Sequence, residues 1–344
     1  MPSGGPVTSR LGRLLLGSTV LLMLSLVACS TPAADGGPDA GGVQPSVSTP
    51  AAATTPPPSA VVLAPLTGVA TTAAVAARPT VVVPIAIPSA RRPNGLGSAD
   101  IVYAEWDGAA RIRLLALFQS QDNATVGPVA GLAPVDAKLL PLVTPVLAAG
   151  PSYAKFSRIA VTAGLNVVSV SRQPSAFQQT SGGTYASTAA LRGFAVRGTR
   201  APQNLFPLAT PGDPLAGSGL KSVTRLKVPT AARPVFSFAW DPAQKRWRGT
   251  VGGAAVSAAN VVVLAMPYKR VPVQNRGPEI STADVFGVGN AYAVSGPHGA
   301  AGRWARNGPL KVTTIGTPDG VSMRFAPGPT WVILVPEGNG WATT

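Results

Sequence analysis

The chain has 344 residues, with 28 Lys or Arg against 13 Asp or Glu and a formal net charge of +15; it contains one Cys and one His. A single thiol forms no internal disulfide, and one Cys with one His leaves no usual set of zinc ligands. We therefore expect no metal site and no disulfide, and the positive charge favours anionic partners.

The first 28 residues have the pattern of a lipoprotein signal peptide. Arg10 and Arg13 precede an apolar run over residues 14–28, which is too short for a comfortable membrane span, and Cys29 follows Ala28 directly. The pattern predicts cleavage before Cys29 and attachment of diacylglycerol, with fatty acyl chains such as palmitate, to its thiol. We therefore expect a lipid anchor on the outer face of the cytoplasmic membrane.

Residues 29–78 consist mainly of Ala, Pro, Thr, Gly and Ser. Such a segment buries too little apolar surface to offset its ordering entropy, so we expect a disordered tether. Only residues 61–70 are apolar enough to dock on the folded part.

The folded part begins with three predicted strands, at residues 80–87, 101–106 and 111–118. The second and third are rich in β-branched, aromatic and aliphatic residues, and Asp107-Gly108 between them is a strong turn signal, so they predict a hairpin. Alternation places Val102 and Trp106 on one face of the second strand and Tyr103 and Glu105 on the other.

This hairpin holds the densest group of charges in the chain: Asp100, Glu105, Asp107, Arg111 and Arg113. Two interpretations are open. The group is either a solvated ladder of surface ion pairs, each contributing less than about 1 kcal/mol, or a ligand site at the strand ends.

Beyond the hairpin, helices alternate with strands. Residues 134–140, 157–165 and 187–194 predict short helices, and residues 166–170 predict a strand. This alternation indicates a mixed α/β amino-terminal domain over residues 79–215.

The remaining residues, 216–344, form short β segments separated by turn dipeptides. We expect a β-rich antiparallel carboxy-terminal domain, and an α+β (or α/β) fold for the whole chain. The predicted strands are 235–240, 246–251, 260–266, 291–294, 302–306, 310–314, 321–325 and 330–335.

Several short motifs recur in an order typical of one family. They are RPNGLGSADIVYAEW at 92–106, RIRLLALFQS at 111–120, VGPV at 126–129, RAPQNLF at 200–206, NVVV at 260–263, GVGNAYA at 287–293, WAR at 304–306 and PGPTWVILVP at 327–336. In these motifs, which span nearly all of the folded part, the chain resembles the YerB-like bacterial lipoproteins. The resemblance implies a lipoprotein of the cell envelope and carries no established biochemical function.

The chain departs from the family pattern at several polar positions. The resemblance implies a glutamate where Ala104 stands, an acid near Gly108, and arginines at Ala130 and Ala133. The residues that match are Asp100, Arg113, Asp136 and Asn204. Loss of part of the polar set favours a divergent binding or scaffold protein over an enzyme.

Other possible catalytic groups are weaker. GVGNAYA has no following helix and predicts no dinucleotide site. His298 lies in a GPHG turn without a serine in a nucleophile context. Two carboxylates could act on a glycan, with Glu105 and either Asp107 or Asp136 as acid and base. Asp100, Arg111, Arg113 and Asn204 are the candidate ligand-binding residues.

These observations predict a membrane-anchored extracytoplasmic lipoprotein that binds or organises a component of the cell envelope. An anionic wall polymer, an anionic lipid or an envelope protein is the expected partner; no nucleic-acid-binding motif is present, and no cofactor is predicted. The alternative is a hydrolase or transferase that acts on peptidoglycan or another wall glycan through Glu105–Asp136. The abundance of Gly, Pro and Ala suggests an actinobacterial source.

Overall fold

The computed structural model describes residues 61–87, 92–106, 111–209, 215, 219–229, 236–274 and 278–344. The predicted signal peptide, Cys29, most of the tether and Asp107 lie outside this range. Residues Pro58–Thr344 form one compact unit. Within the described residues, none of the helices has the length and apolar character needed to cross a bilayer.

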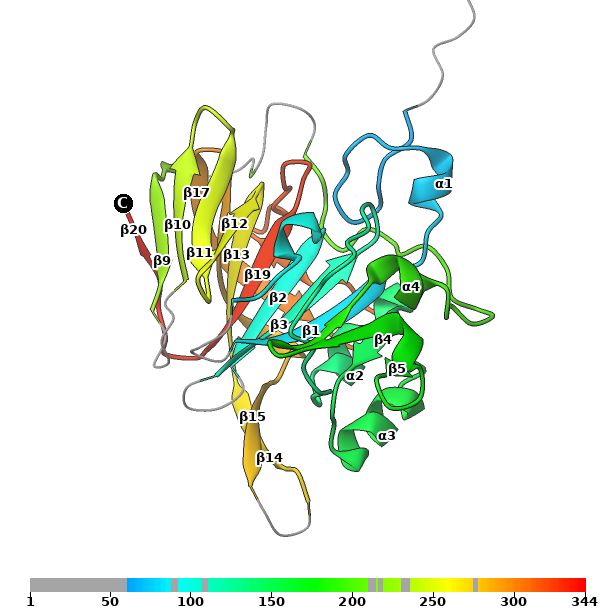
Figure 1. The fold of residues 1–344 in the computed structure, drawn as a ribbon. Coiled ribbons are helices and arrows are strands. Elements are labelled where there is room, and N and C mark those ends of the chain that lie inside the picture. The colour runs from blue at the N-terminus through cyan, green and yellow to red at the C-terminus, as the bar shows by residue number, and fades with distance from the viewer. Residues whose placement is uncertain are drawn as a thin grey trace, which may run out of the picture. The chain divides into compact units, whose positions relative to one another are not determined.

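An eleven-stranded sheet forms the centre of this unit (Figure 1). A short strand, β8 (Lys221–Ser222), pairs with β17 beside the main path. Along that path the order is β18 (Thr314–Gly316), β17 (His298–Arg306), β16 (Gly287–Ser295), β13 (Asn260–Met266), β19 (Thr330–Pro336), β2 (Ile101–Trp106), β3 (Ile112–Phe118), β1 (Val81–Ile87), β4 (Val146–Ala149) and β5 (Asn166–Ser169).

Strand β19 joins the two halves of the sequence. It lies between β13 and β2 and runs parallel to both, with Val332 opposite Val262 on one side and Tyr103 on the other. The expectation of a wholly antiparallel carboxy-terminal unit is therefore wrong at β19. The predicted domain boundary near residue 215 stays a prediction. Strands from both sides of this boundary belong to one sheet.

The predicted hairpin is confirmed as β2 and β3, which pair antiparallel from Ile101 opposite Leu117 to Trp106 opposite Ile112. The predicted alternation also holds. Val102 and Trp106 belong to one buried cluster and Tyr103 to the other. Both faces of the hairpin are buried, however, and not half-buried as its sequence suggested, because both faces of the central sheet are covered.

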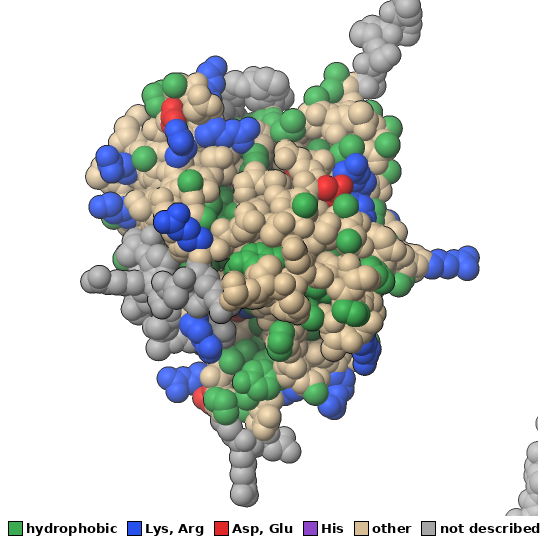
Figure 2. Space-filling model, in the orientation of Figure 1, with side chains coloured by type: hydrophobic (Ala, Val, Ile, Leu, Met, Phe, Trp, Pro, Cys, Tyr) green, Lys and Arg blue, Asp and Glu red, His purple; other side chains and the backbone are tan. Residues whose placement is uncertain are grey.

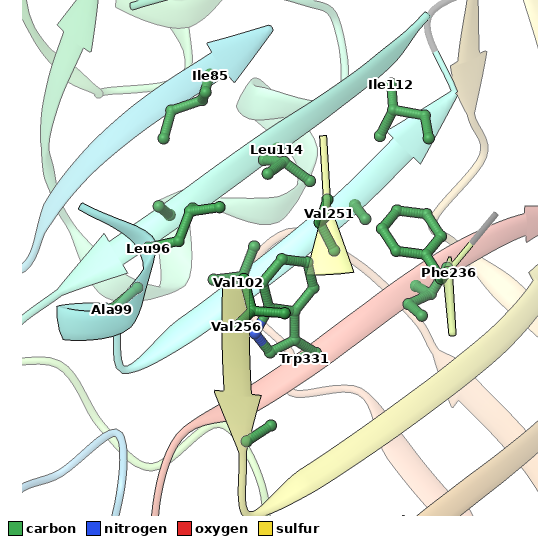
Figure 3. Close-up of a cluster of buried hydrophobic side chains, with 14 of the residues drawn as sticks. Ile85, Leu96, Ala99, Val102, Ile112, Leu114, Phe236, Val251, Val256 and Trp331 are labelled. Atoms are coloured by element: carbon green, nitrogen blue, oxygen red, sulfur yellow. The ribbon is translucent and has the colours of Figure 1, made fainter. Parts of the chain in front are cut away.

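One face of the central sheet packs against a second, five-stranded sheet of order β12-β11-β10-β9-β20. Its strands are β9 (Arg225–Val228), β10 (Phe236–Asp241), β11 (Arg246–Val251), β12 (Ala254–Ala258) and β20 (Ala342–Thr343). The rings of Phe236 and Phe238 lie 6.3 and 5.8 Å from that of Trp331. Figure 3 shows Trp331 at the centre of this cluster, near Val102 and Val256.

The opposite face is covered in part by the helices α2 (Asp136–Leu139) and α3 (Ala154–Thr162). Helix α4 (Thr188–Arg192) packs on the first face, and α1 (Ala73–Ala76) buries no residue. Two-stranded ribbons complete the structure: β6 (Phe177–Thr180) with β7 (Gly183–Ala186), and β14 (Tyr268–Pro272) with β15 (Glu279–Ala283), which projects from the sheet in Figure 1. The fold of the described residues is β-rich.

The predicted helices and strands were right in their type more often than in their first and last residues. The helices predicted at 134–140, 157–165 and 187–194 are present but shorter or shifted, and Ser187 caps α4 by accepting a hydrogen bond from the Ala190 amide. Two strand predictions were wrong. The strand predicted at 310–314 overlaps β18 only at Thr314, and residues 321–325 form only isolated bridges, because Met323 and Phe325 pack into the core from coil.

Candidate functional site

The charged residues predicted on the hairpin converge with α2 at a buried ion pair. Arg113 of β3 donates from Nη1 to Oδ1 of Asp136 and from Nη2 to Oδ2 of Asp136, each at 2.7 Å. Its Nε and Nη2 also donate to the carbonyl of Gly131, at 3.2 and 3.1 Å. Asp136 is the first residue of α2 and accepts a further hydrogen bond from the Ala133 amide at 2.9 Å. This bidentate geometry fixes the loop 131–136 against the sheet.

Glu105 lies opposite Arg113 across the hairpin, with Oε2 at 4.0 Å from Nη1 of Arg113. Its other oxygen, Oε1, accepts hydrogen bonds from the Thr282 hydroxyl and the Ala283 amide, both at 3.0 Å. Thr282 and Ala283 end strand β15. The carboxylate therefore connects the central sheet to the base of the β14–β15 ribbon.

Burial is the main influence on the ionisation of Glu105. Its loss of contact with water raises its pKa to about 7, although the Arg113 charge and the Ala283 amide act in the opposite direction. The negative charge of Asp136 adds to the rise. At neutral pH Glu105 is therefore divided between its neutral and charged forms.

Tyr268 of β14 provides a second connection at the base of the ribbon. Its hydroxyl donates to the Leu334 carbonyl at 2.9 Å and accepts from the Trp106 amide at 3.3 Å. Asp284, just beyond β15, pairs with Lys138 of α2 at 3.2 Å and with Lys269 of β14. The ribbon is thus held to β2, β19 and α2 by polar contacts.

Arg306 extends these contacts to the carbonyl end of α2. Its Nη2 donates to the carbonyls of Lys138 and Leu139 at 3.0 and 3.3 Å, and its guanidinium lies 5.9 Å from the centre of the Phe286 ring. Burial lowers its pKa. A cation at this position satisfies carbonyls that have no partner within the helix.

The structure does not bring all predicted site residues together. Asp100 lies directly before β2, five residues or about 17 Å along an extended chain from Glu105. It accepts hydrogen bonds from the Gln119 and Ser120 amides and from the Ser120 hydroxyl, and so fixes the end of β3. Arg111 and Asn204 are exposed. Asp107 and Cys29 lie outside the described residues.

The interpretation of the hairpin charges as a solvated ladder is wrong for Glu105 and Arg113. The side chains of Arg113, Glu105 and Asp136 are 5%, 4% and 0% exposed. Sequence reasoning missed Thr282 of β15, Lys138 of α2, Arg306 of β17, and Gly131 and Asp284 of the connecting loops, some of which contribute through the main chain. The acids and cations among them were visible, but no spacing linked them to the hairpin.

The positions at which the resemblance implies arginines lie in the same loop as Gly131. Ala130 exchanges main-chain hydrogen bonds with Pro84 and Gly150, and the Ala133 amide bonds to Asp136. Ala104 is fully buried in the sheet. At these three positions the chain therefore has methyl groups in place of charged side chains; Ala130 and Ala133 lie in the loop of the Arg113–Asp136 pair, whereas Ala104 belongs to the cluster on the other face of the sheet.

The cavities among the described residues include the following four. A cavity of about 830 Å³ lies between α3 and β5, and one of about 660 Å³ lies along β11 and β12. Two of about 490 Å³ lie beside Asp100 and beside Trp341. Neither Glu105 nor Asp136 lines any of these four. No group of three or more His, Cys, Asp or Glu in the described residues is placed to hold a metal ion.

Fold and site define a class of β-sheet proteins in which a parallel central strand unites two sequence halves around a buried Arg–carboxylate cluster. Residues 66–202 match the family described as Protein of unknown function (DUF3048), N-terminal domain, and residues 226–332 match its C-terminal domain. The chain belongs to this YerB-like family.

The fold is also found in a solved structure. The crystal structure of YerB protein from Bacillus subtilis is similar with a TM-score of 0.67 and 18% identity, over 82% of this chain and 99% of that chain. At this identity the likeness shows the fold alone. No curated protein matches the sequence.

Proposed function

We propose that the protein is a non-catalytic binding or scaffold lipoprotein of the cell envelope. The observation that carries the non-catalytic role is that the predicted catalytic carboxylates are already engaged: Asp136 by Arg113 and Glu105 by Thr282 and the Ala283 amide. A general acid or base must come within hydrogen-bond reach of its substrate. Glu105 and Asp136 are both buried and line none of the four cavities described above.

Location on the membrane is supported by the sequence around Cys29. The basic residues, the apolar run and the cysteine after Ala28 support lipidation and anchoring to the outer face of the cytoplasmic membrane. Removal of residues 1–28 takes away Arg10 and Arg13 and no acid, so the net charge of +15 becomes +13. This charge supports an anionic partner, such as a wall polymer or a lipid headgroup. The confinement of the described α-helices to residues 73–192 supports α+β as the finer fold class.

The anchor is tested by Cys29→Ser in the full chain, with Ser30→Ala as the matched control. The Cys29→Ser variant should leave the membrane fraction and take up no labelled fatty acid, whereas the control should stay membrane-bound and labelled. Fatty-acid labelling of the Cys29→Ser variant would contradict lipidation at this residue.

The raised pKa of Glu105 favours a second candidate, a hydrolase or transferase acting on wall glycan, because a general acid needs a pKa near the working pH. Glu105→Gln separates the two functions, since the amide oxygen can accept the hydrogen bonds from Thr282 and Ala283. We expect the variant to complement a deletion strain as well as the control Glu279→Gln, whose side chain is exposed. Loss of complementation with undiminished stability and an unchanged membrane level would support the enzyme and contradict the non-catalytic role.

A further inference from the structure

The five-stranded sheet has one buried face and one exposed face. Leu226, Phe236, Phe238, Trp247 and Val256 point inward to the cluster around Trp331. Residues directly opposite each other in antiparallel strands share a face. The outward face is therefore fixed by the pairing of the strands.

This outward face carries four cations. Ala239 lies opposite Arg225 on one side and Arg248 on the other, so these side chains share the outward face. Lys227, opposite Ser237, and Arg246, opposite Asp241, belong to the same face. Figure 2 shows Lys and Arg side chains over the part of the molecule where Figure 1 places β9, β10 and β11. We call Arg225, Lys227, Arg246 and Arg248 the basic face.

Asp241 is the acid on this face, and it neutralises only one of the four cations. Its Oδ2 lies 3.1 Å from Nη1 of Arg248, and its Oδ1 accepts from the amides of Ala243 and Gln244. These hydrogen bonds hold its pKa below the usual range, so it stays charged at neutral pH. The basic face thus keeps a net positive charge that attracts anions.

The remaining outward residues of the sheet are small. They include Ser237, Ala239, Thr250, Ala255 and Ser257, and none of the exposed large apolar side chains among the described residues lies on these five strands. Peripheral binding to a bilayer draws on apolar side chains that enter the lipid. A flat polar surface with spaced cations is better suited to a hydrated polymer than to a membrane.

The basic face is also hollowed. The cavity of about 660 Å³ is lined by Arg246, Arg248, Thr250 and Ser257, among others. The neighbouring cavity of about 490 Å³ shares Arg246 and Ser257 with it and continues toward Asp100 and Ser120. Guanidinium groups beside hydroxyl groups are suited to a unit that carries both negative charge and hydroxyls.

We propose that the basic face binds a linear anionic polysaccharide. Its carboxylate or phosphate groups pair with Arg225, Lys227 and Arg246, the three cations that Asp241 does not neutralise, and sugar hydroxyls bond to Thr250 and Ser257 in the cavity. Neighbouring strands are about 4.8 Å apart, and successive residues of one face are about 7 Å apart along a strand. A polymer with repeated charges can therefore engage several cations at once, which a single small anion cannot do. This inference deepens the proposed envelope function by naming a ligand class and a site.

The test measures binding of polygalacturonate, a carboxylated polysaccharide, to the full chain purified in mild detergent, with neutral dextran for comparison. The variant Arg225→Ser/Lys227→Ser/Arg246→Ser should bind about tenfold more weakly, because three ion pairs with the polymer are lost. The control Arg158→Ser/Arg172→Ser/Arg197→Ser removes three exposed cations elsewhere and should bind like the wild type. Added salt should weaken wild-type binding.

Each other outcome overturns the inference. If the basic-face variant binds polygalacturonate as tightly as the wild type, the site lies elsewhere. If the control variant loses binding, the site lies at the α3–β5 cavity. Both results leave the proposed envelope function intact. If the wild type binds neutral dextran as tightly as polygalacturonate, the ligand needs no negative charge and the proposed anionic ligand class is wrong. Binding to phosphatidylglycerol vesicles without binding to the polysaccharide makes the basic face a membrane contact. Thermal unfolding of each variant must match that of the wild type before its binding is compared.

Discussion

At the scale of residues, the Arg113–Asp136 pair shows how two charges become structural once they are buried together. In place of water, the Arg113 guanidinium has two hydrogen bonds to the Asp136 carboxylate and further ones to the carbonyl of Gly131. Removing one partner leaves the other charge buried without compensation, which costs far more than the pair contributes over an apolar replacement.

Asp136→Ala should therefore lower the free energy of unfolding by about 3–5 kcal/mol. The double variant Arg113→Met/Asp136→Leu should lose clearly less, because it leaves no isolated charge at this position. Urea denaturation of the three proteins measures both values. A double variant that loses as much stability as Asp136→Ala, or more, would contradict this account.

The raised pKa of Glu105 predicts a dependence of stability on pH. Between about pH 4.5 and pH 7 the unfolded chain has lost this proton while the folded chain keeps it, so stability falls as the pH rises. The contribution is fully present below pH 4.5, and about 3 kcal/mol of it is lost once the pH exceeds 7.

Glu105→Gln cannot titrate and should gain stability relative to the wild type over this interval. Urea denaturation of both proteins at pH 4.5 and pH 7.5 gives the change in their difference. A difference that is the same at both values would show that Glu105 is ionised in the folded protein at both.

At this scale the sequence identified residues but not their surroundings. Glu105, Arg113 and Asp136 were all singled out, with Glu105 and Arg113 in the group of hairpin charges, but the pairing of Glu105 opposite Arg113 came from the structure. Thr282 and Ala283 could not be found, because a backbone amide has no sequence signature and the partner is 178 positions away. Burial, which separates a surface ladder from an internal cluster, depends on atoms from the whole chain.

At the scale of elements, the β14–β15 ribbon depends on polar anchors at its base. Glu105 holds Thr282 and Ala283, and Tyr268 holds the ends of β2 and β19. The ribbon itself has only two strands, which are marginally stable alone in water.

Thr282→Val keeps the shape of the side chain but removes the hydroxyl that donates to Glu105. We expect faster amide hydrogen exchange over residues 279–283, by about tenfold, with little change in exchange in β11, because one hydrogen bond to a charged group is lost. Ser281→Ala on the same strand serves as the control. Unchanged exchange in β15 would show that the remaining contacts of Ala283, Tyr268 and Asp284 hold the ribbon without the Thr282 hydroxyl.

Element prediction succeeded where local pattern and packing agreed. The hairpin, β1, β13 and β19 are apolar runs bounded by turn residues, and each is a strand. The strand prediction at 321–325 was wrong. Met323 and Phe325 alternate as in a strand and are buried, but this segment forms only isolated bridges and no ladder with a neighbouring strand. Periodicity predicts which side chains are buried, but not whether a second strand lies alongside.

At the scale of the whole molecule, β19 makes the two halves depend on each other. Trp331 packs between the central and five-stranded sheets, and β19 provides the parallel neighbour of β2. Residues 58–215 alone would expose the face of β2 and β3 that the five-stranded sheet covers.

A fragment covering residues 58–215 should therefore show no cooperative thermal unfolding, and adding residues 216–344 as a separate chain should restore it. Circular dichroism during heating measures both outcomes. A cooperative transition in the first fragment alone would show that the amino-terminal half is an independent domain.

The sequence by itself determined the family, the β-rich character, most strands and the charged residues of the hairpin, because these follow from motifs and from alternation along a short stretch of chain. Only the tertiary structure decided that β19 lies parallel between β13 and β2, that Glu105 and Asp136 are buried around Arg113, and that four cations share the outward face of the five-stranded sheet. The physical reason is that strand order, burial and shared faces arise from pairings between residues far apart in the sequence, and no local pattern specifies those pairings.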